Sequence, residues 1–179
     1  MRPVDINRIF TLSTNIMEIM FGGLTIPREF KGLVENYLKE HRFLISFEST
    51  IDEDTHISKE HYLSLLNDSA KLTELSNYTG CMISIFAFEN LKTLPQYDNI
   101  KHEIPVLFLY HLRNASAHGN KFNFYIDKNR TRFRDPGTIM WKNKIIERGL
   151  QDKIAYPDFI SVGDIPYLFE DISKIIEYI

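Results

Sequence analysis

The fold is decided by the stretch LFLYHLRNASAHGN, residues 107–120. Its leucines and alanines favour a helix, and Gly119 suits the left-handed position that follows a helix. At about 100° per residue, one apolar face contains His111; its other members are Ile104, Leu107, Phe108, Leu112 and Ala115. A second apolar group surrounds Arg113 on the far side: Val106, Leu109, Tyr110 and Ala117. A helix that is apolar nearly all round is buried on both sides, and another copy of the protein is one source of the second burial.

The last turns of this helix carry a distinctive spacing of side chains. Arg113 is followed by the polar Asn114, by three small residues, and then by His118 and a glycine. This pattern resembles the signature of the HEPN superfamily, in which four to six residues separate an arginine from a following histidine. The resemblance covers residues 105–120. It implies a helical bundle that dimerises along the motif helix and cleaves RNA in a shared cleft, in toxin–antitoxin or phage-defence systems.

The resemblance also implies roles for individual residues: Arg113 and His118 are catalytic, and Asn114 is a supporting polar position. Cleavage of RNA without a metal needs a base for the 2′-hydroxyl, an acid for the leaving oxygen and a cation near the phosphate. Histidine suits proton transfer near neutral pH, and the planar guanidinium of arginine suits phosphate. In one subgroup, which is paired with a nucleotidyltransferase antitoxin, a modifiable tyrosine stands two residues after the histidine. Asn120 stands there in this chain, which disfavours such a partner.

The helix alone does not bring Arg113 and His118 to one point, because they are about 140° apart on an ideal helix. Two copies related by a two-fold axis would bring two such pairs into one groove. We therefore expect a homodimer that acts on RNA and uses no cofactor and no metal ion. His111 lies seven residues before His118. We interpret it as a hydrogen-bonded core histidine, with an assisting role left open.

The segment after the histidine is basic, although the whole chain has a formal net charge of -3. Between residues 121 and 148, eight Lys and Arg residues accompany three Asp and Glu residues. Four of the basic residues are candidates for binding the RNA backbone: Lys121, Lys128, Arg130 and Arg132. A solvated hairpin surface explains the same charges equally well. The other four are Arg134, Lys142, Lys144 and Arg148.

The whole pattern predicts one mainly α domain over residues 1–179, a HEPN-like antiparallel helical bundle. A small antiparallel β-sheet is inserted between the motif helix and the C-terminal helix, within a β-rich elaboration at 121–148. Helical spacing predicts helices over residues 3–21, 27–49, 58–75, 81–94, 99–118 and 164–179, with a kink or break at 77–80. Alternation predicts strands near 122–126, 138–141 and 144–146, and residues 51–56 read as an acidic turn.

Composition narrows the class of protein. Hydrophobic residues make up 44% and charged residues 25% of the chain, which is typical of a soluble globular protein. A single cysteine, Cys81, excludes an internal disulfide and a metal site built on cysteines, and we expect a buried, inert thiol. No apolar run approaches the ~20 residues that span a bilayer, so a cytoplasmic protein is expected.

Trp141 is interpreted as a packing residue, with base stacking as the alternative, and Glu89 as a surface or capping residue.

Three hypotheses follow. The first is a metal-independent endoribonuclease of the HEPN type in prokaryotic toxin–antitoxin or phage-defence systems, with an antitoxin protein left open as a further partner. The second is a non-catalytic HEPN-fold module that binds RNA, a nucleotide or a protein partner. The third is a structural interaction protein, in which Arg113 would form an ion pair within its own chain, away from any cleft.

Overall fold

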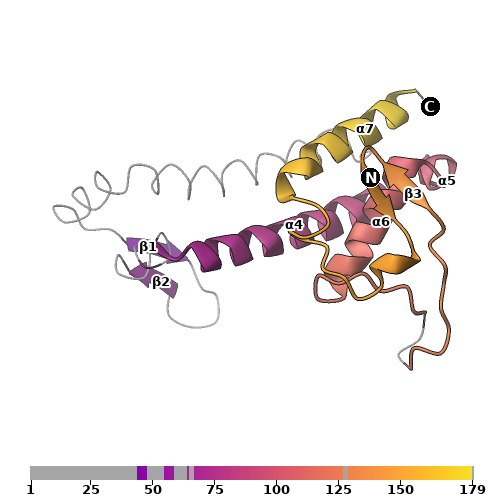
Figure 1. Cartoon of the computed structure of the whole chain (residues 1–179). Helices are drawn as coiled ribbons and strands as arrows, with labels where there is room; N and C mark the ends of the chain where they lie inside the picture. Colours follow the sequence, from indigo (N-terminus) through magenta and orange to yellow (C-terminus); the bar gives the residue numbers. More distant parts are fainter. Residues whose placement is uncertain (1–43, 48–54, 59–63, 65–66, 127–128, 179) are drawn as a thin grey trace. The chain divides into compact units, whose positions relative to one another are not determined.

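The computed structural model describes residues 44–47, 55–58, 64, 67–126 and 129–178 of the 179-residue chain (Figure 1). The chain divides into two compact units, Met17–Ser76 and the remainder, which comprises Met1–Ile16 and Asn77–Ile179. The predicted helix over residues 3–21 and most of the one over 27–49 lie outside the described residues. One domain over residues 1–179 stays a prediction.

The smaller unit contains a β-hairpin where the sequence predicted helix. Strand β1, Leu44–Phe47, pairs antiparallel with β2, Thr55–Ser58, so that Leu44 lies opposite Ser58 and Phe47 opposite Thr55. The predicted helix to residue 49 is therefore wrong at its end. The helix predicted to open at Ser58 and the turn at 51–56 are likewise wrong where β2 stands. A short apolar run fits both helical and strand spacing, and the β-branched residues of 55–58 favour the strand.

Helix α4, Ser69–Leu91, begins next to an aspartate that caps it. Asp68 Oδ1 accepts hydrogen bonds of 3.1 Å from the backbone N–H groups of Ala70 and Lys71. Such a cap satisfies donors that the first turn leaves unpaired. The helix continues through residues 77–80, so the predicted kink or break there is wrong. Gly80 does not turn the chain; it allows close packing, because a Cβ there would lie 2.9 Å from the Val162 side chain.

The motif helix is α6, Ile104–Ala117, and a short helix α5, Tyr97–Ile100, precedes it. The sequence predicted one helix over 99–118, whereas the structure separates the two pieces at residues 101–103. Pro105 lies in the first turn of α6, where its missing N–H costs nothing. The C-terminal end is as predicted: the N–H of His118 donates to the carbonyls of Asn114 and Ala115, and Gly119 has φ +71°.

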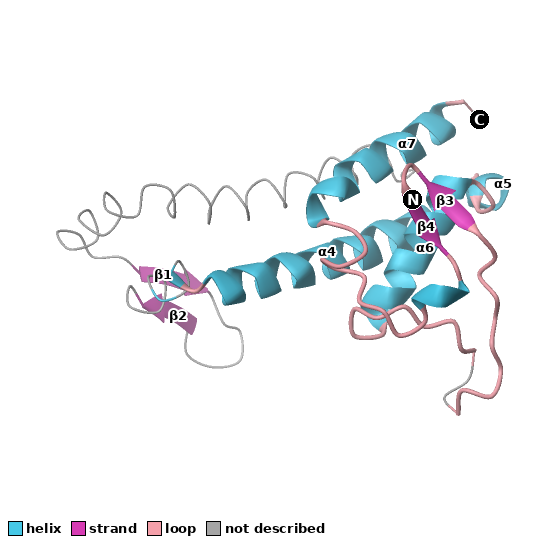
Figure 2. Cartoon of the chain, viewed as in Figure 1, coloured by secondary structure: helices cyan, strands magenta, loops and turns pink. Residues whose placement is uncertain are grey.

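The core of the larger unit forms around α6. The antiparallel hairpin of β3, Ile139–Trp141, and β4, Lys144–Ile146, packs on α6 through β3, and helix α7, Ile165–Glu177, also contacts α6 (Figures 1 and 2). Residues from both apolar groups of α6 are buried: Val106, Phe108, Leu109, Leu112 and Ala115. A second copy of the protein is therefore not required to bury this helix.

Trp141 holds the hairpin on the helices, as predicted. Its ring is buried with its centroid 5.1 Å from that of Phe108, and its Nε1–H donates to Asp171 of α7 at 2.9 Å. Helix α7 begins at Ile165, directly after Asp164 as predicted, but the carboxylate of Asp164 does not cap it and instead accepts hydrogen bonds from the N–H and hydroxyl of Ser161 at 3.0 Å. The apolar face of α7 is buried through Ile165, Leu168, Phe169 and Ile172.

The segment after α6 is irregular. The predicted strand at 122–126 is wrong, because only isolated bridges form there, between Lys121 and Ile154 and between Tyr125 and Phe133. The strands predicted at 138–141 and 144–146 are confirmed by β3 and β4. In its described residues the protein is thus mainly helical with small antiparallel sheets (Figure 2).

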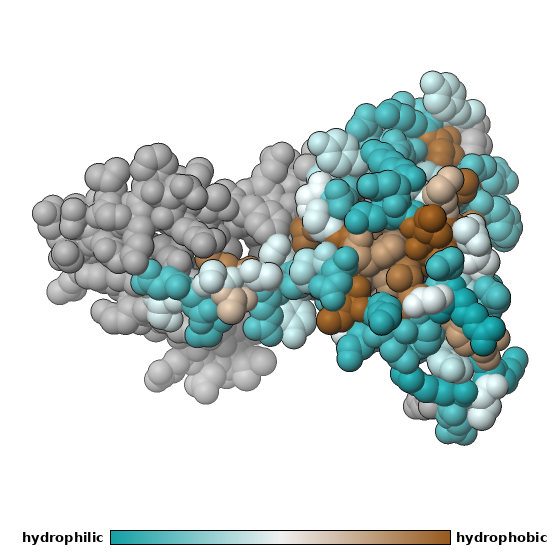
Figure 3. Space-filling view, in the orientation of Figure 1, coloured by the Kyte–Doolittle hydropathy of each residue, from teal (hydrophilic) through white to brown (hydrophobic). Residues whose placement is uncertain are grey.

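Cys81 is buried, and burial raises the pKa of its thiol, which agrees with the expected inert residue. None of the helices within the described ranges is long and apolar enough to cross a membrane. Apolar side chains also remain on the surface, and Figure 3 shows some of them as a brown patch framed by hydrophilic residues on the face in view. The most exposed within the described part of the chain are Tyr78, Met82, Met140 and Tyr178.

Candidate functional site

A cavity of about 350 Å³ lies at the C-terminal half of α6 and the chain that follows it. Volumes of this order suit small ligands. Helix α6 lines one side with Leu107, Tyr110, His111, Asn114 and, just beyond its end, His118. The segment after the helix supplies the other polar and aromatic residues that line the cavity, principally Asn123, Phe124, Tyr125, Arg134 and Asp135.

Two of the three predicted catalytic residues reach this cavity. Asn114 and His118 are four residues apart, and both side chains line it. Side chains four apart on a helix lie on one face. Arg113 does not line the cavity. As expected from their spacing on the helix, Arg113 and His118 do not meet within one chain, and their predicted meeting across a homodimer stays a prediction.

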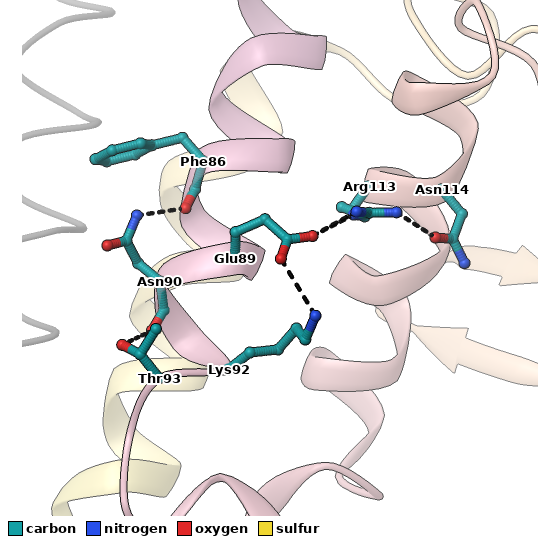
Figure 4. A network of polar contacts seen from close by, with 7 residues as sticks. All are labelled: Phe86, Glu89, Asn90, Lys92, Thr93, Arg113 and Asn114. Carbon is teal, nitrogen blue, oxygen red and sulfur yellow. Dashed lines mark hydrogen bonds and ion pairs between the residues drawn. The ribbon is translucent and has the colours of Figure 1, made fainter.

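Arg113 instead bridges α6 to α4 (Figure 4). Its Nε donates to Glu89 Oε1 at 2.8 Å, and its Nη2 forms an ion pair with the same oxygen. Glu89 also accepts a hydrogen bond from Lys92 at 3.2 Å. Partial burial alone raises the pKa of Glu89, but the bonds from Lys92 and Arg113 outweigh it, so this pKa lies below its ordinary value. Glu89 is thus a partner of the motif arginine, a role that the sequence did not indicate.

The same guanidinium also reaches the cavity indirectly. Nη1 of Arg113 donates to Oδ1 of Asn114 at 3.1 Å (Figure 4). Because this bond occupies the amide oxygen of Asn114, the amide nitrogen is left to donate to a ligand. Glu89, Arg113 and Asn114 therefore form a chain of contacts from α4 to the cavity wall.

His111 is the main site residue that the sequence interpretation undervalued. Its imidazole lies between two rings, with centroids 4.9 Å from Tyr110 and 5.7 Å from Phe124. Within the described part of the chain its side chain has no hydrogen-bond partner, so the hydrogen-bonded core histidine is wrong. Burial, aided by the positive charge of Arg134, lowers the pKa of His111 to about 4. At neutral pH this imidazole is uncharged.

Arg134 provides the guanidinium that the cavity contains. Its backbone N–H donates to the carbonyl of Phe124 at 2.8 Å, which places residue 134 beside the cavity wall. The residue is exposed, and it makes no ion pair with any residue that the structure describes. The sequence grouped Arg134 with the basic segment but gave no signal that it lies near His111, since the irregular backbone pairing of 124–126 with 132–134 decides this.

The four predicted RNA-binding residues do not line the cavity. Lys128 lies outside the described residues, and Lys121 and Arg132 are exposed elsewhere. Arg130 is held by Asp152 through two hydrogen bonds of 3.1 and 2.8 Å, and it stacks over the ring of Tyr125. Part of the basic segment is thus neutralised by its own chain.

Asn120 fixes the chain directly after the motif. Its side chain accepts the N–H of Tyr156 at 2.9 Å and donates to the carbonyl of the same residue at 2.6 Å. Its φ of 65° is one that asparagine tolerates better than most residues. Asn120 is therefore a structural clamp that holds the segment behind His118.

No protein family, curated protein or solved structure matches this chain. Within the described ranges, no group of three His, Cys, Asp or Glu side chains is placed to hold a metal ion. Function must therefore be argued from the chemistry of the cavity.

Proposed function

We propose that this protein is a metal-independent endoribonuclease of the HEPN type, with a HEPN-like helical bundle, that acts in the prokaryotic cytoplasm in a toxin–antitoxin or phage-defence system. The observation that carries the proposal is the cavity, in which His118 and Asn114 of the motif meet a second histidine and an arginine. The resemblance of residues 113–118 to the HEPN signature supports it. RNA is the substrate, the protein acts as a homodimer, and an antitoxin protein is left open as a further partner.

The chemistry needs only the side chains of the cavity. A base removes the proton of the ribose 2′-hydroxyl, and the oxygen attacks the adjacent phosphorus while the bond to the 5′-oxygen breaks. His118, which is exposed and lines the cavity at the end of α6, protonates the leaving oxygen in this proposal. The products are a 2′,3′-cyclic phosphate and a 5′-hydroxyl. Asn114 donates its amide N–H to a phosphate oxygen.

Arg113 has a different task in this proposal from the one that the resemblance implies. Its guanidinium is engaged by Glu89 and Asn114, so it acts as a positioning residue that presents the Asn114 amide to the substrate. A different cation must therefore contact the phosphate.

The same ion pair favours a second candidate function. The Glu89–Arg113 contact is the intrachain ion pair expected of the structural interaction protein, and a non-catalytic module that binds RNA or a nucleotide in the cavity would also contain it. Such a module binds RNA equally well after His118→Ala and cleaves none.

The discriminating experiment measures degradation of a mixed RNA pool in EDTA. We expect wild type to cleave, His118→Ala to be slower by a factor of about 100 or more, and His102→Ala to match wild type. His102 is exposed and does not line the cavity, which makes it the matched control. Equal rates for wild type and His118→Ala would contradict the ribonuclease proposal and support the binding module.

A further inference from the structure

We infer that the cleavage site is complete within one chain: His111 supplies the second proton-transfer group and Arg134 the phosphate contact. This inference rests on the proposed ribonuclease function and names two catalytic residues outside the arginine–histidine motif. It replaces a groove shared by two subunits with a cavity inside each subunit.

The two histidines are brought to one cavity by helix geometry. His111 and His118 are seven residues apart, which is close to two helical turns, so both lie on one side of α6 and its C-terminal end. Both side chains line the cavity, and neither has a hydrogen-bond partner within the described part of the chain. Polar groups at a cavity wall that lack partners in the protein are the groups that a ligand can satisfy.

The cation comes from the other side of the same cavity. Arg134 is tied through its backbone to Phe124, and its positive charge is close enough to His111 to act on the imidazole. Arg113 and Arg130, by contrast, are already paired with Glu89 and Asp152. Arg134 is therefore the guanidinium of the described segment that is both at the cavity and available for the paired hydrogen bonds that a phosphate accepts.

In the proposed reaction each proton has a named donor and a named acceptor. Neutral His111 takes the proton from the 2′-hydroxyl, and the 2′-oxygen forms its bond to phosphorus. The bond from phosphorus to the 5′-oxygen breaks, and protonated His118 gives its proton to that oxygen. Arg134 stabilises the charge on the non-bridging oxygens throughout. Water then opens the cyclic phosphate or the product leaves, so no co-reactant other than water is needed.

The surroundings of His111 agree with the base role. Tyr110 contacts it and His118 lines the same cavity from its own helix, and Tyr125, Arg134 and Asp135 line the cavity from the segment packed on that helix. The net result is the lowered pKa of His111 described above: the imidazole is unprotonated at neutral pH and free to accept a proton, but it is a weaker base than an ordinary histidine.

Mixed oligomers test whether the site lies within one chain. His111→Gln and His118→Gln keep polar side chains of similar size, and each is expected to cleave RNA at least 100-fold more slowly than wild type. The two variants are co-expressed with different tags and purified through both tags. We expect no recovery of activity, because neither chain retains both histidines. Recovery to about half of the wild-type rate, or full activity of His111→Gln alone, overturns the inference.

A second measurement does not depend on cleavage. The imidazole NMR signals of His111 and His118 are followed while a deoxydinucleotide, which has no 2′-hydroxyl, is added to the full chain. Both signals are expected to shift with one dissociation constant, which Arg134→Gln raises at least fivefold and Arg130→Gln leaves unchanged. A shift of His118 without His111 contradicts the inference even if RNA is cleaved. Joint shifts without any RNA cleavage by wild type contradict the ribonuclease proposal and the catalytic roles, and leave only a one-chain phosphate pocket.

Discussion

Arg113 of α6 is paired with Glu89 of α4 through a hydrogen bond of 2.8 Å from Nε to Oε1 (Figure 4). The pair is intermediate in exposure, with 31% of the Arg113 side chain and 39% of the Glu89 side chain accessible. Because the same guanidinium also holds Asn114, the contact between two helices is linked to the wall of the cavity. The motif arginine is thus tied into the structure of its own chain.

This relationship predicts coupled effects of substitution at the two positions. Glu89→Gln and Arg113→Gln are each expected to lower the free energy of unfolding by about 1 kcal/mol, since a solvent-accessible pair is weak. The double variant should lose little more than either single one, as urea denaturation would show. Lys92→Gln, which removes the other partner of Glu89, is the control and should change stability less.

The pair also predicts how cleavage responds. If Arg113 acts through Asn114, Glu89→Gln and Arg113→Gln should lower kcat/KM by similar factors, on the order of tenfold. A loss of 100-fold or more in Arg113→Gln, with normal kinetics in Glu89→Gln, would show that Arg113 contacts the phosphate itself.

His111 predicts a dependence of stability on pH. The unfolded chain protonates this imidazole near its ordinary pKa of about 6.5, whereas the folded protein does so only near the lowered pKa of about 4. The unfolded state therefore binds more protons between these values, and the contribution of His111 to stability is lost as the pH falls. Between pH 7 and 5, wild type should lose about 1–2 kcal/mol more than His111→Gln in denaturant titrations. Equal losses would mean that His111 titrates normally.

The cations of the basic segment should differ in their effect on RNA binding. Arg134→Gln is expected to weaken binding of single-stranded RNA and to reduce the salt dependence of log K by about 0.7. Arg130→Gln should change both quantities little, because Asp152 already neutralises that guanidinium. Fluorescence anisotropy at several salt concentrations measures both, and the reverse order of the two variants would refute the assignment.

Gly80 predicts a packing defect on substitution. In Gly80→Ala the new Cβ would lie 2.9 Å from Val162 Cγ2 and 3.0 Å from Tyr156, whose side chain is fully buried. We expect a loss of about 1–3 kcal/mol by thermal or urea denaturation. Gly163→Ala is the matched control, since its Cβ would meet nothing closer than 3.7 Å. Equal stability of the two variants would mean that α4 is not packed closely at residue 80.

The sequence predicted the elements whose signals are local. The end of α6 follows from Gly119, the start of α7 from Asp164, and the β3–β4 hairpin from its alternating residues. The sequence-based prediction was wrong at Leu44–Phe47, where one residue pattern fits both a helix and a strand. It was also wrong at Gly80, where the glycine allows close packing and does not form a turn.

The candidate site was predictable only in part for a similar reason. Asn114 and His118 lie on one helix, so their common face follows from spacing. The partner of Arg113 is Glu89, 24 residues earlier, and Arg134 reaches the cavity through a backbone bond to Phe124. Both are tertiary contacts that helical spacing does not encode.

The products formed from a single defined strand show whether the cavity cleaves RNA by attack of the 2′-hydroxyl. Wild type in EDTA is incubated with a single-stranded RNA and with the same strand carrying 2′-O-methyl groups, and the fragments are identified by mass spectrometry. We expect fragments ending in a 2′,3′-cyclic phosphate and a 5′-hydroxyl from the RNA, and none from the methylated strand. Cleavage of both strands, or of neither when wild type is in excess, would contradict this mechanism.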